Sequence, residues 1–167
     1  MINQNLPGIK KIEYCHQSEM EIVPLKKYLA GDIVSPIGNF TELPIVDLAS
    51  CEVSTEETEQ GNVYTTTIET LSTIDKFSRT SHILLSFYFI YRITDIYNNQ
   101  YLIGIKQRPF PSISITNRID RTPSGQRVSE VKITFKSTIP PLNCSRYKCL
   151  KFVRLCTHIL SLNANIQ

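Results

Sequence analysis

The stretch that decides the fold is Phe87–Ile105, which reads FYFIYRITDIYNNQYLIGI. Its two halves, 87–95 and 100–105, are rich in aromatic and β-branched residues, which favour β-strands. Between the halves stands Ile96-Tyr97-Asn98-Asn99. Because asparagine tolerates positive φ angles, Asn98-Asn99 fits a tight turn. The sequence therefore predicts an antiparallel β-hairpin at this place.

Further segments have the composition or the alternation of strands. The most regular is Val128–Ser137, in which Val131, Ile133 and Phe135 are expected to face a core. The residues between them, Lys132, Thr134 and Lys136, are expected to face solvent. The other predicted strands are 9–14, 32–34, 45–53, 63–71 and 112–116.

Polar and proline-containing segments separate these strands. The acidic segment 54–62 ends in Gly61-Asn62, which predicts a loop that connects two strands of a hairpin. Residues 106–111 must leave the sheet or lie at its edge, because Pro109 and Pro111 cannot donate to a ladder. Residues 117–127 are predicted as a loop or arm, and Pro140-Pro141 as the end of the sheet.

Two segments have helical spacing. A short helix is predicted near 76–85, where Ile74, Phe77, Ser81, Leu84 and Leu85 approximate one face. A basic amphipathic helix is predicted near 146–160, with Lys148, Lys151 and Arg154 on the face away from its apolar residues. This second helix is expected to dock on its own sheet or on a partner, and a final strand is the alternative for the same segment.

Many short strands and few helices predict a mainly β protein, either an antiparallel β-sandwich or a small barrel with one or two helices. We expect a β-domain over 1–141 and a basic amphipathic appendage over 142–167. A chain of 167 residues can bury enough surface to be stable without disulfides or a metal.

The cysteines and the N-terminal residues suggest a reducing compartment. The first residues lack the pattern of a signal peptide, and no apolar run is long enough to span a membrane. The number of cysteines is odd, at five, which does not fit a disulfide framework. Cys144, Cys149, Cys156 and His158 lack the paired spacing of zinc ligands, so we expect buried thiols, no metal and no cofactor.

Charge is divided along the chain. Nine acidic residues and no lysine or arginine lie between Tyr28 and Asp75, whereas 14 basic and three acidic residues follow from Lys76 onward. Three interpretations remain open. The two halves neutralise each other within the fold, an acidic face of one copy meets a basic face of the next, or the basic half binds nucleic acid.

No catalytic motif is present. The sequence has no phosphate-binding glycine loop, no nucleophile elbow and no zinc-protease motif. Its histidines, His16, His82 and His158, lie far apart, and an enzyme would need one of them beside a carboxylate or thiol in a pocket. We therefore expect a protein that is not an enzyme.

The segments Tyr91–Asp95, Gln100–Gly104 and Arg108–Pro111 resemble a pattern in small tail and neck proteins of phages and prophages from Bacteroidetes hosts. In that pattern a strand ends in Thr-Asp, turns, returns as Tyr-Leu-Ile-Gly and enters a proline-containing loop. Asn98-Asn99 departs from the more usual glycine turn, and the basic C-terminal tail lies outside the pattern. The resemblance implies a tail-tube-like sandwich, a tail terminator or a connector that assembles into a ring.

The first hypothesis is therefore a virion structural protein, made in the host cytoplasm, that forms a homo-oligomeric ring or tube. It would contact other neck or tail proteins, and DNA where the ring has a lumen, but not a membrane. The candidate interaction residues are Glu56, Glu57, Glu59, Arg108, Arg118, Arg121, Arg127, Lys148, Lys151 and Arg154.

Two other hypotheses stay open. One is a nucleic-acid-binding β-barrel module, for which steep salt dependence of binding is expected. Its candidate residues are Lys106, Arg108, Arg118, Arg121 and Arg127. The other is a β-sandwich interaction domain of a host protein.

Overall fold

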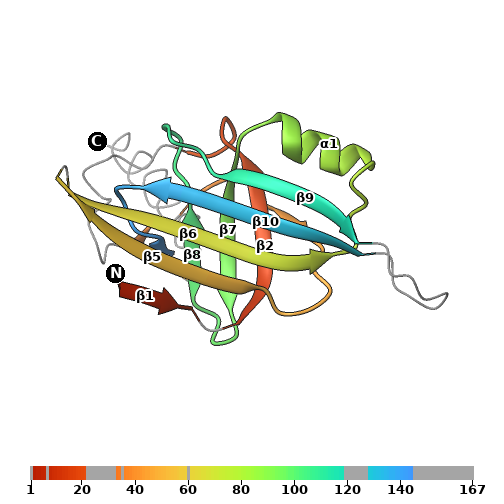
Figure 1. The fold of residues 1–167 in the computed structure, drawn as a ribbon. Coiled ribbons are helices and arrows are strands. Elements are labelled where there is room, and N and C mark those ends of the chain that lie inside the picture. Colours follow the sequence, from red (N-terminus) through yellow and green to blue (C-terminus); the bar gives the residue numbers. More distant parts are fainter. Residues whose placement is uncertain are drawn as a thin grey trace, which may run out of the picture.

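A computed structural model describes residues 2–6, 8–21, 33–34, 36–59, 61–118 and 128–144, and for 2–5, 33–34 and 118 it gives the course of the backbone alone. These residues form two β-sheets and a short helix (Figure 1). The mainly β fold predicted from the sequence is confirmed.

The first sheet has the strand order β1-β5-β6-β10-β9, and all of its neighbours are antiparallel. It is built around β6 and β10, which pair over nine residues from Tyr64↔Ser137 to Ser72↔Ser129. The strands of this sheet are β1 (Ile2–Asn5), β5 (Ser50–Thr58), β6 (Gly61–Ser72), β9 (Ser112–Arg118) and β10 (Val128–Ser137).

The second sheet has the order β3-β11-β8-β7-β2-β4, and among its pairs β3 and β11 run parallel. Its strands cross those of the first sheet (Figure 1). The two sheets remain separate, so the fold is a sandwich and not a closed barrel. The strands are β2 (Ile9–His16), β3 (Ile33–Val34), β4 (Thr41–Leu43), β7 (Phe89–Asp95), β8 (Gln100–Ile103) and β11 (Leu142–Cys144).

The main core lies between the inner faces of the sheets. On β10 the predicted alternation is confirmed, because Val131, Ile133 and Phe135 are buried while the intervening side chains are exposed or half-buried. Ile133 lies opposite Ile68 on one side and Ile113 on the other. The second sheet contributes Ile9, Ile12, Tyr91, Ile93 and Ile103 to the same cluster.

The second sheet also has a buried outer face. Most of β7 is buried on both faces, which explains its nearly continuous run of apolar residues. The outer cluster consists of Cys15, Met20, Ile90, Leu102, Ile105, Leu142 and Cys144, with Phe40 and Ile139 packed against it.

The helix α1 (Arg79–Ser86) begins three residues later than predicted, because Ser78 caps it. The Ser78 hydroxyl accepts a hydrogen bond from the backbone N–H of Ser81 at 3.2 Å. The helix buries Ser81 and Leu84 and contacts β9. Two residues predicted for the inward face, Phe77 and Leu85, are exposed instead. The helix predicted near 146–160 lies outside the described residues.

Several strand boundaries differ from the prediction. Over the predicted strand 45–53, Ile45 forms one isolated bridge to Ser72, and regular pairing starts at Ser50. The strands β1, β4 and β11 were not predicted, because they are short and carry little apolar alternation. Pro140-Pro141 does not end the sheet structure, since the chain crosses there into β11 of the second sheet. Residues beyond Cys144 lie outside the described part.

The predicted turn between β7 and β8 is confirmed. Asn98 adopts a φ of 66°. The carboxylate of Asp95, which is fully buried, accepts hydrogen bonds from the backbone N–H of Asn99 at 2.7 Å and from its side-chain amide at 2.9 Å. Asp95 at the end of β7 therefore fixes the turn that the sequence placed there.

This turn gives a direct test of the backbone argument. Asn98→Ala should lower the free energy of unfolding by about 1 kcal/mol, because alanine is strained at positive φ. Asn98→Gly should cost less than half as much, since glycine is not strained there. Urea titration measures both. Equal losses would instead assign the effect to the side-chain oxygen of Asn98, which accepts a hydrogen bond from Lys10.

Candidate functional site

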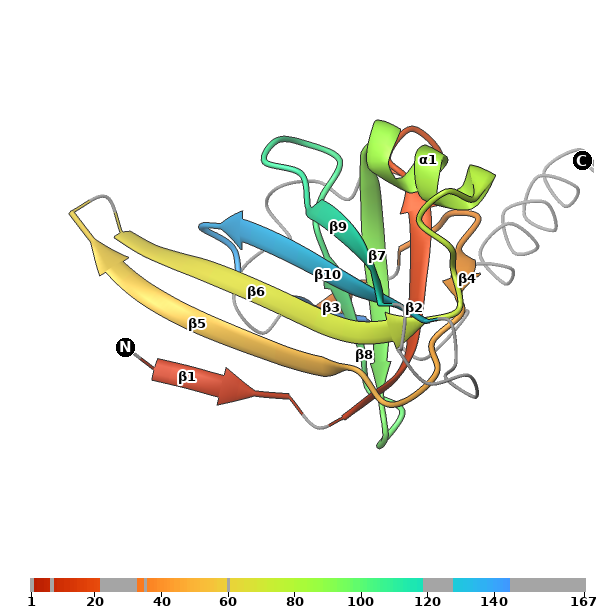
Figure 2. The same ribbon diagram turned by 45° about the vertical axis from the view of Figure 1, so that its right-hand side comes forward.

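The hairpin of β5 and β6 projects beyond the strands of the second sheet (Figure 2). We call its outer part, residues 54–58 and 61–65, the arm. At its tip Gly61 has a φ of 114°, and the Thr58 hydroxyl donates to the Gly61 carbonyl at 2.7 Å. The arm is the most prominent projection that the described residues make from the sandwich (Figures 1 and 2).

The three acidic candidates lie on the arm or at its tip, and all are exposed. The hairpin predicted here is confirmed, since β5 and β6 pair antiparallel, but the predicted extent of its loop, 54–62, is wrong, because Glu56 pairs with Val63 and Glu57 with Asn62 in the β-ladder. The strand β1 accompanies β5 only as far as Thr55. Beyond that point the hairpin is two strands wide, so a polar sequence can form strand without facing a core.

The basic candidates within the described residues come from different segments of the chain. Arg108 is exposed in the segment that follows β8, as predicted for residues outside the strands. Arg118 ends β9, about 20 Å along the chain from the start of that strand at roughly 3.3 Å per residue. The Lys106 ammonium lies 3.4 Å from the Met20 carbonyl. Arg121, Arg127, Lys148, Lys151 and Arg154 lie outside the described residues.

Part of the divided charge is neutralised within the chain. Lys132 on β10 and Glu69 on β6 are register partners, and their charged atoms are 2.8 Å apart. Each side chain is about half exposed, so this pair contributes little to stability. It shows that the acidic and basic halves of the sequence meet on the outer face of the first sheet.

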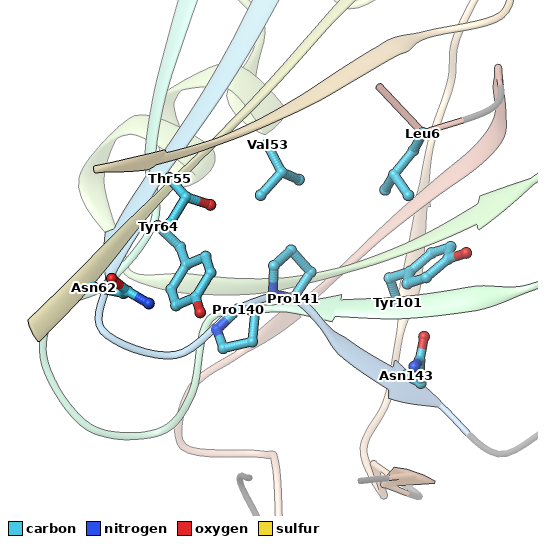
Figure 3. A pocket seen from close by; sticks show the side chains of 9 residues that line it. All are labelled: Leu6, Val53, Thr55, Asn62, Tyr64, Tyr101, Pro140, Pro141 and Asn143. Atoms are coloured by element: carbon cyan, nitrogen blue, oxygen red, sulfur yellow. The ribbon is translucent and has the colours of Figure 1, made fainter. Parts of the chain in front are cut away.

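A cleft of about 510 Å³ opens between the two sheets, from the root of the arm out to Asn62 (Figure 3). One wall comes from β5 and β6, and the other comes from β8 and the crossover into β11 (Figure 3). The lining residues are Leu6, Val53, Thr55, Asn62, Tyr64, Tyr101, Pro140, Pro141 and Asn143. None of them belongs to the candidate residues predicted from the sequence. The sequence indicates the Pro140-Pro141 pair only as an end of the sheet.

The cleft presents neutral groups. Its lining residues offer phenol, amide and hydroxyl groups beside proline and aliphatic surface, and none is acidic or basic. Burial raises the pKa of Tyr101, and the neighbouring Asp95 carboxylate adds to this effect, so the phenol stays protonated. Such a lining suits the binding of an uncharged surface and lacks a group for acid–base chemistry at neutral pH.

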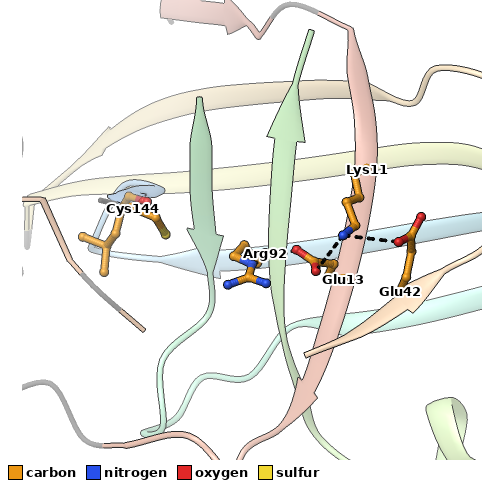
Figure 4. A network of polar contacts seen from close by, with 6 residues as sticks. Lys11, Glu13, Glu42, Arg92 and Cys144 are labelled. Carbon is orange, nitrogen blue, oxygen red and sulfur yellow. Dashed lines mark hydrogen bonds and ion pairs between the residues drawn. The ribbon is translucent and has the colours of Figure 1, made fainter. Parts of the chain in front are cut away.

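A chain of ion pairs lies on the outer face of the second sheet (Figure 4). Arg92 Nε donates to Glu13 Oε2 at 2.8 Å, and the Arg92 guanidinium lies 4.1 Å from the centre of the Phe40 ring. Lys11 Nζ lies 3.0 Å from Glu13 Oε1 and 3.2 Å from Glu42 Oε2. Burial by itself raises the pKa of Glu13, but hydrogen bonds from Arg92 and Lys11 outweigh it and the pKa is lowered.

We interpret this network as one that stabilises the second sheet. The Glu13 side chain is only 7% exposed, and it faces Arg92 directly in the β2–β7 register. Both charges are satisfied by each other and by neighbours, which is the condition for keeping them in a buried sheet face. No pocket residue described above belongs to the network.

The described thiols are poor nucleophiles and poor metal ligands. Cys15, Cys51 and Cys144 are buried and free. Burial raises the pKa of Cys51 and of Cys144 to about 12, so both are protonated at neutral pH. In the described ranges no group of three or more His, Cys, Asp or Glu side chains is placed to hold a metal ion. Cys149, Cys156 and His158 lie outside those ranges.

Of the two histidines that the structure describes, one contacts neighbouring side chains and the other is exposed. His16 Nδ1 lies 2.6 Å from the Ser18 hydroxyl, and its ring contacts Phe87 and Phe89 edge-on. His82 is exposed on α1. Neither residue lines the cleft.

Comparison with protein-family models, with curated proteins and with solved structures finds no match to this chain. Among the described residues there is no helix of the length and apolar character needed to cross a membrane. The functional argument therefore rests on the arm, the cleft and the exposed surface.

Proposed function

We propose that this protein is a virion structural protein, a subunit of a homo-oligomeric ring or tube at a phage neck or tail. In this proposal the copies associate head-to-tail, and the arm of each copy contacts the next. The observation that carries the proposal is the arm itself.

The tip of the arm is two strands wide, because β1 pairs with β5 only as far as Thr55 and β10 pairs with β6 only as far as Tyr64. A two-stranded hairpin without a second layer is marginally stable in water. Here the outer part of β5 and β6 extends past the sheet that covers the rest of the sandwich (Figure 2). Docking on a neighbouring subunit would supply the missing layer. Several known assemblies gain order in this way, when an extended segment adds to another chain.

The charge at the tip indicates the surface that the arm would meet. Glu56, Glu57 and Glu59 are all exposed. Such a tip favours a basic surface, and the sequence from Lys76 onward carries most of the basic residues, including exposed Arg108. The resemblance to phage tail and neck proteins agrees with a repeated contact of this kind.

The test is the mass and shape of the purified chain at low and high salt, by light scattering and negative-stain microscopy. Rings or tubes that loosen in about 0.5 M salt are expected, because exposed charge pairs are screened at that ionic strength. At low salt, the double variant Glu56→Gln/Glu57→Gln should assemble only at a protein concentration about tenfold or more above that of the unmodified chain.

A matched control removes two exposed acidic residues away from the arm, Glu19→Gln/Glu21→Gln. This control should assemble like the unmodified chain. If both double variants weaken assembly equally, net charge and not the arm controls association, and the arm contact is wrong. A chain that stays monomeric at every concentration, and that also fails to join any neck or tail complex, would contradict the proposed function as a whole.

A further inference from the structure

The cleft described above lies where the core of the sandwich would otherwise continue. Residues that lie opposite each other in an antiparallel pair share one face of the sheet. On the inner face of β5 and β6, Cys51 opposite Ile68 belongs to the main core, and the lining residues that follow towards the arm are Val53, Thr55 and Tyr64. The inner face therefore changes from apolar to polar where it lines the cleft (Figure 3).

The opposite wall of the cleft combines fixed surfaces with an amide. Tyr101 on β8 and Asn143 on β11 are register partners, and both line the cleft. The Tyr101 hydroxyl is hydrogen-bonded to the buried Asp95 carboxylate, which holds the aromatic ring in place. Pro140 and Pro141 add rigid apolar surface to the lining. A ligand would therefore meet flat apolar surfaces and a polar group on the same wall.

Four lining side chains carry hydrogen-bonding groups that have no partner among the residues the structure describes: Thr55, Asn62, Tyr64 and Asn143. Two are amides and two are hydroxyls, so together they can both donate and accept. Thr66, the register partner of Val53, is 1% exposed, and its hydroxyl also lacks a partner in the described part of the chain. Such free groups are available to a ligand that can both donate and accept hydrogen bonds.

The lining disfavours ions and purely apolar molecules. No lining residue is charged, so an ion that entered would lose hydration without gaining a counter-charge. Glu57, which lies opposite Asn62 on the same face of the arm, is exposed and would repel an anion. A purely apolar molecule would cover the free amides and hydroxyls without replacing their bonds to water, which costs free energy.

The strands along the cleft leave no open edge to which a peptide could add. β5 is paired with β6, and with β1 as far as Thr55, while β8 is paired with β7 and β11. A peptide in the cleft would therefore meet side chains only, and the main-chain hydrogen bonds that give affinity in strand addition would not form. The cleft suits a compact ligand that carries many hydrogen-bonding groups of its own.

We propose that the cleft binds an uncharged saccharide. The C–H groups of a sugar ring form an apolar face that packs on proline and on aromatic rings, whose negative faces attract these C–H groups. The hydroxyls around a sugar ring both donate and accept, which matches the free groups of the lining. The volume of about 510 Å³ lies within the ordinary range for small-molecule sites. This inference goes beyond the proposed assembly and does not depend on it.

The test is saturation-transfer NMR of the full chain, which detects a bound sugar whether the protein is a monomer or a ring. The probes are trisaccharides of glucose, mannose, galactose, rhamnose and N-acetylglucosamine. At least one should bind with a Kd of about 1 mM or below. Sialyllactose, which is anionic, should bind at least about tenfold more weakly. Asn62→Ala/Asn143→Ala should weaken binding of the same trisaccharide by about tenfold or more, because two hydrogen-bonding amides are lost.

Asn39→Ala is the matched control, because Asn39 is an exposed asparagine outside the cleft, and it should bind the sugar like the unmodified chain. Circular dichroism must show that each variant is folded. The inference is overturned if no trisaccharide binds at about 10 mM, if the double variant binds as tightly as the control, or if sialyllactose binds as tightly as the neutral sugars. Failure of the chain to form rings alters none of these results, so the two proposals can fail separately.

Discussion

Ile133→Ala should lower the free energy of unfolding by about 4 kcal/mol. Ile133 is 1% exposed on the inner face of β10, the strand that joins β6 to β9. Its register partners on the two sides are Ile68 and Ile113. Truncation there removes buried methyl groups and leaves a cavity that two flanking strands cannot fill without breaking their own pairing.

Thr134→Ala is the matched control, because it lies one residue further along the same strand and faces outward. It should change the free energy of unfolding by less than about 1 kcal/mol. Urea titration followed by circular dichroism measures both variants. A loss at Thr134 as large as the loss at Ile133 would mean that β10 is stabilised through its outer face, contrary to the sandwich described above.

Arg92→Met should lower the free energy of unfolding by about 3 kcal/mol at pH 7. Methionine keeps much of the side-chain volume, so the loss measures the charge and not the packing. Without Arg92 the buried Glu13 carboxylate keeps Lys11 as its remaining cation, and the ring of Phe40 loses the guanidinium above it. Lys11→Met should cost less, about 0.5 to 1 kcal/mol, because the Lys11 side chain is 39% exposed.

The pH dependence gives a second readout for Arg92. In the unmodified chain the pKa of Glu13 is lowered on folding from its ordinary value of 4.5, so its contribution to stability is present above that value. The contribution is lost as the pH falls through the lowered pKa. Removal of Arg92 raises the pKa of Glu13 in the folded protein. The difference in stability between the two proteins should therefore shrink as the pH falls from 7 towards 3, and a constant difference would contradict the charge argument.

The parts of the fold that could be predicted are those in which local chemistry and tertiary contacts agree. The Asn98-Asn99 turn depends on one positive φ angle, which asparagine tolerates. The alternation of β10 records a strand with one face on a core and one face in water. In both cases a few adjacent residues contain the whole physical reason.

The rest depends on contacts between distant parts of the chain. The polar strand β1 forms because β5 offers it an edge, not because its own residues favour a strand. The sequence pattern places Glu56 and Glu57 in a loop, because an acidic segment has no core to face, yet β6 pairs with both residues. Tyr64 and Tyr101 line one cleft from different sheets, and nothing local to either residue reports the other.

The crossover at Pro140-Pro141 has a consequence for how the chain is made. The long pairings join early and late segments, such as Ile12 with Ile93 and Ile68 with Ile133. Such non-local pairing slows folding into the range of milliseconds to seconds, because the entropy of closing long loops is lost before the favourable contacts form. As the chain leaves the ribosome, β6 cannot pair with β10 until β10 has been made. The second sheet likewise lacks one of its strands until β11, which follows the two prolines, has been made. The nascent chain therefore keeps an apolar sheet face uncovered until β10 and β11 have both been made, and an exposed face of this kind is prone to aggregate during that interval.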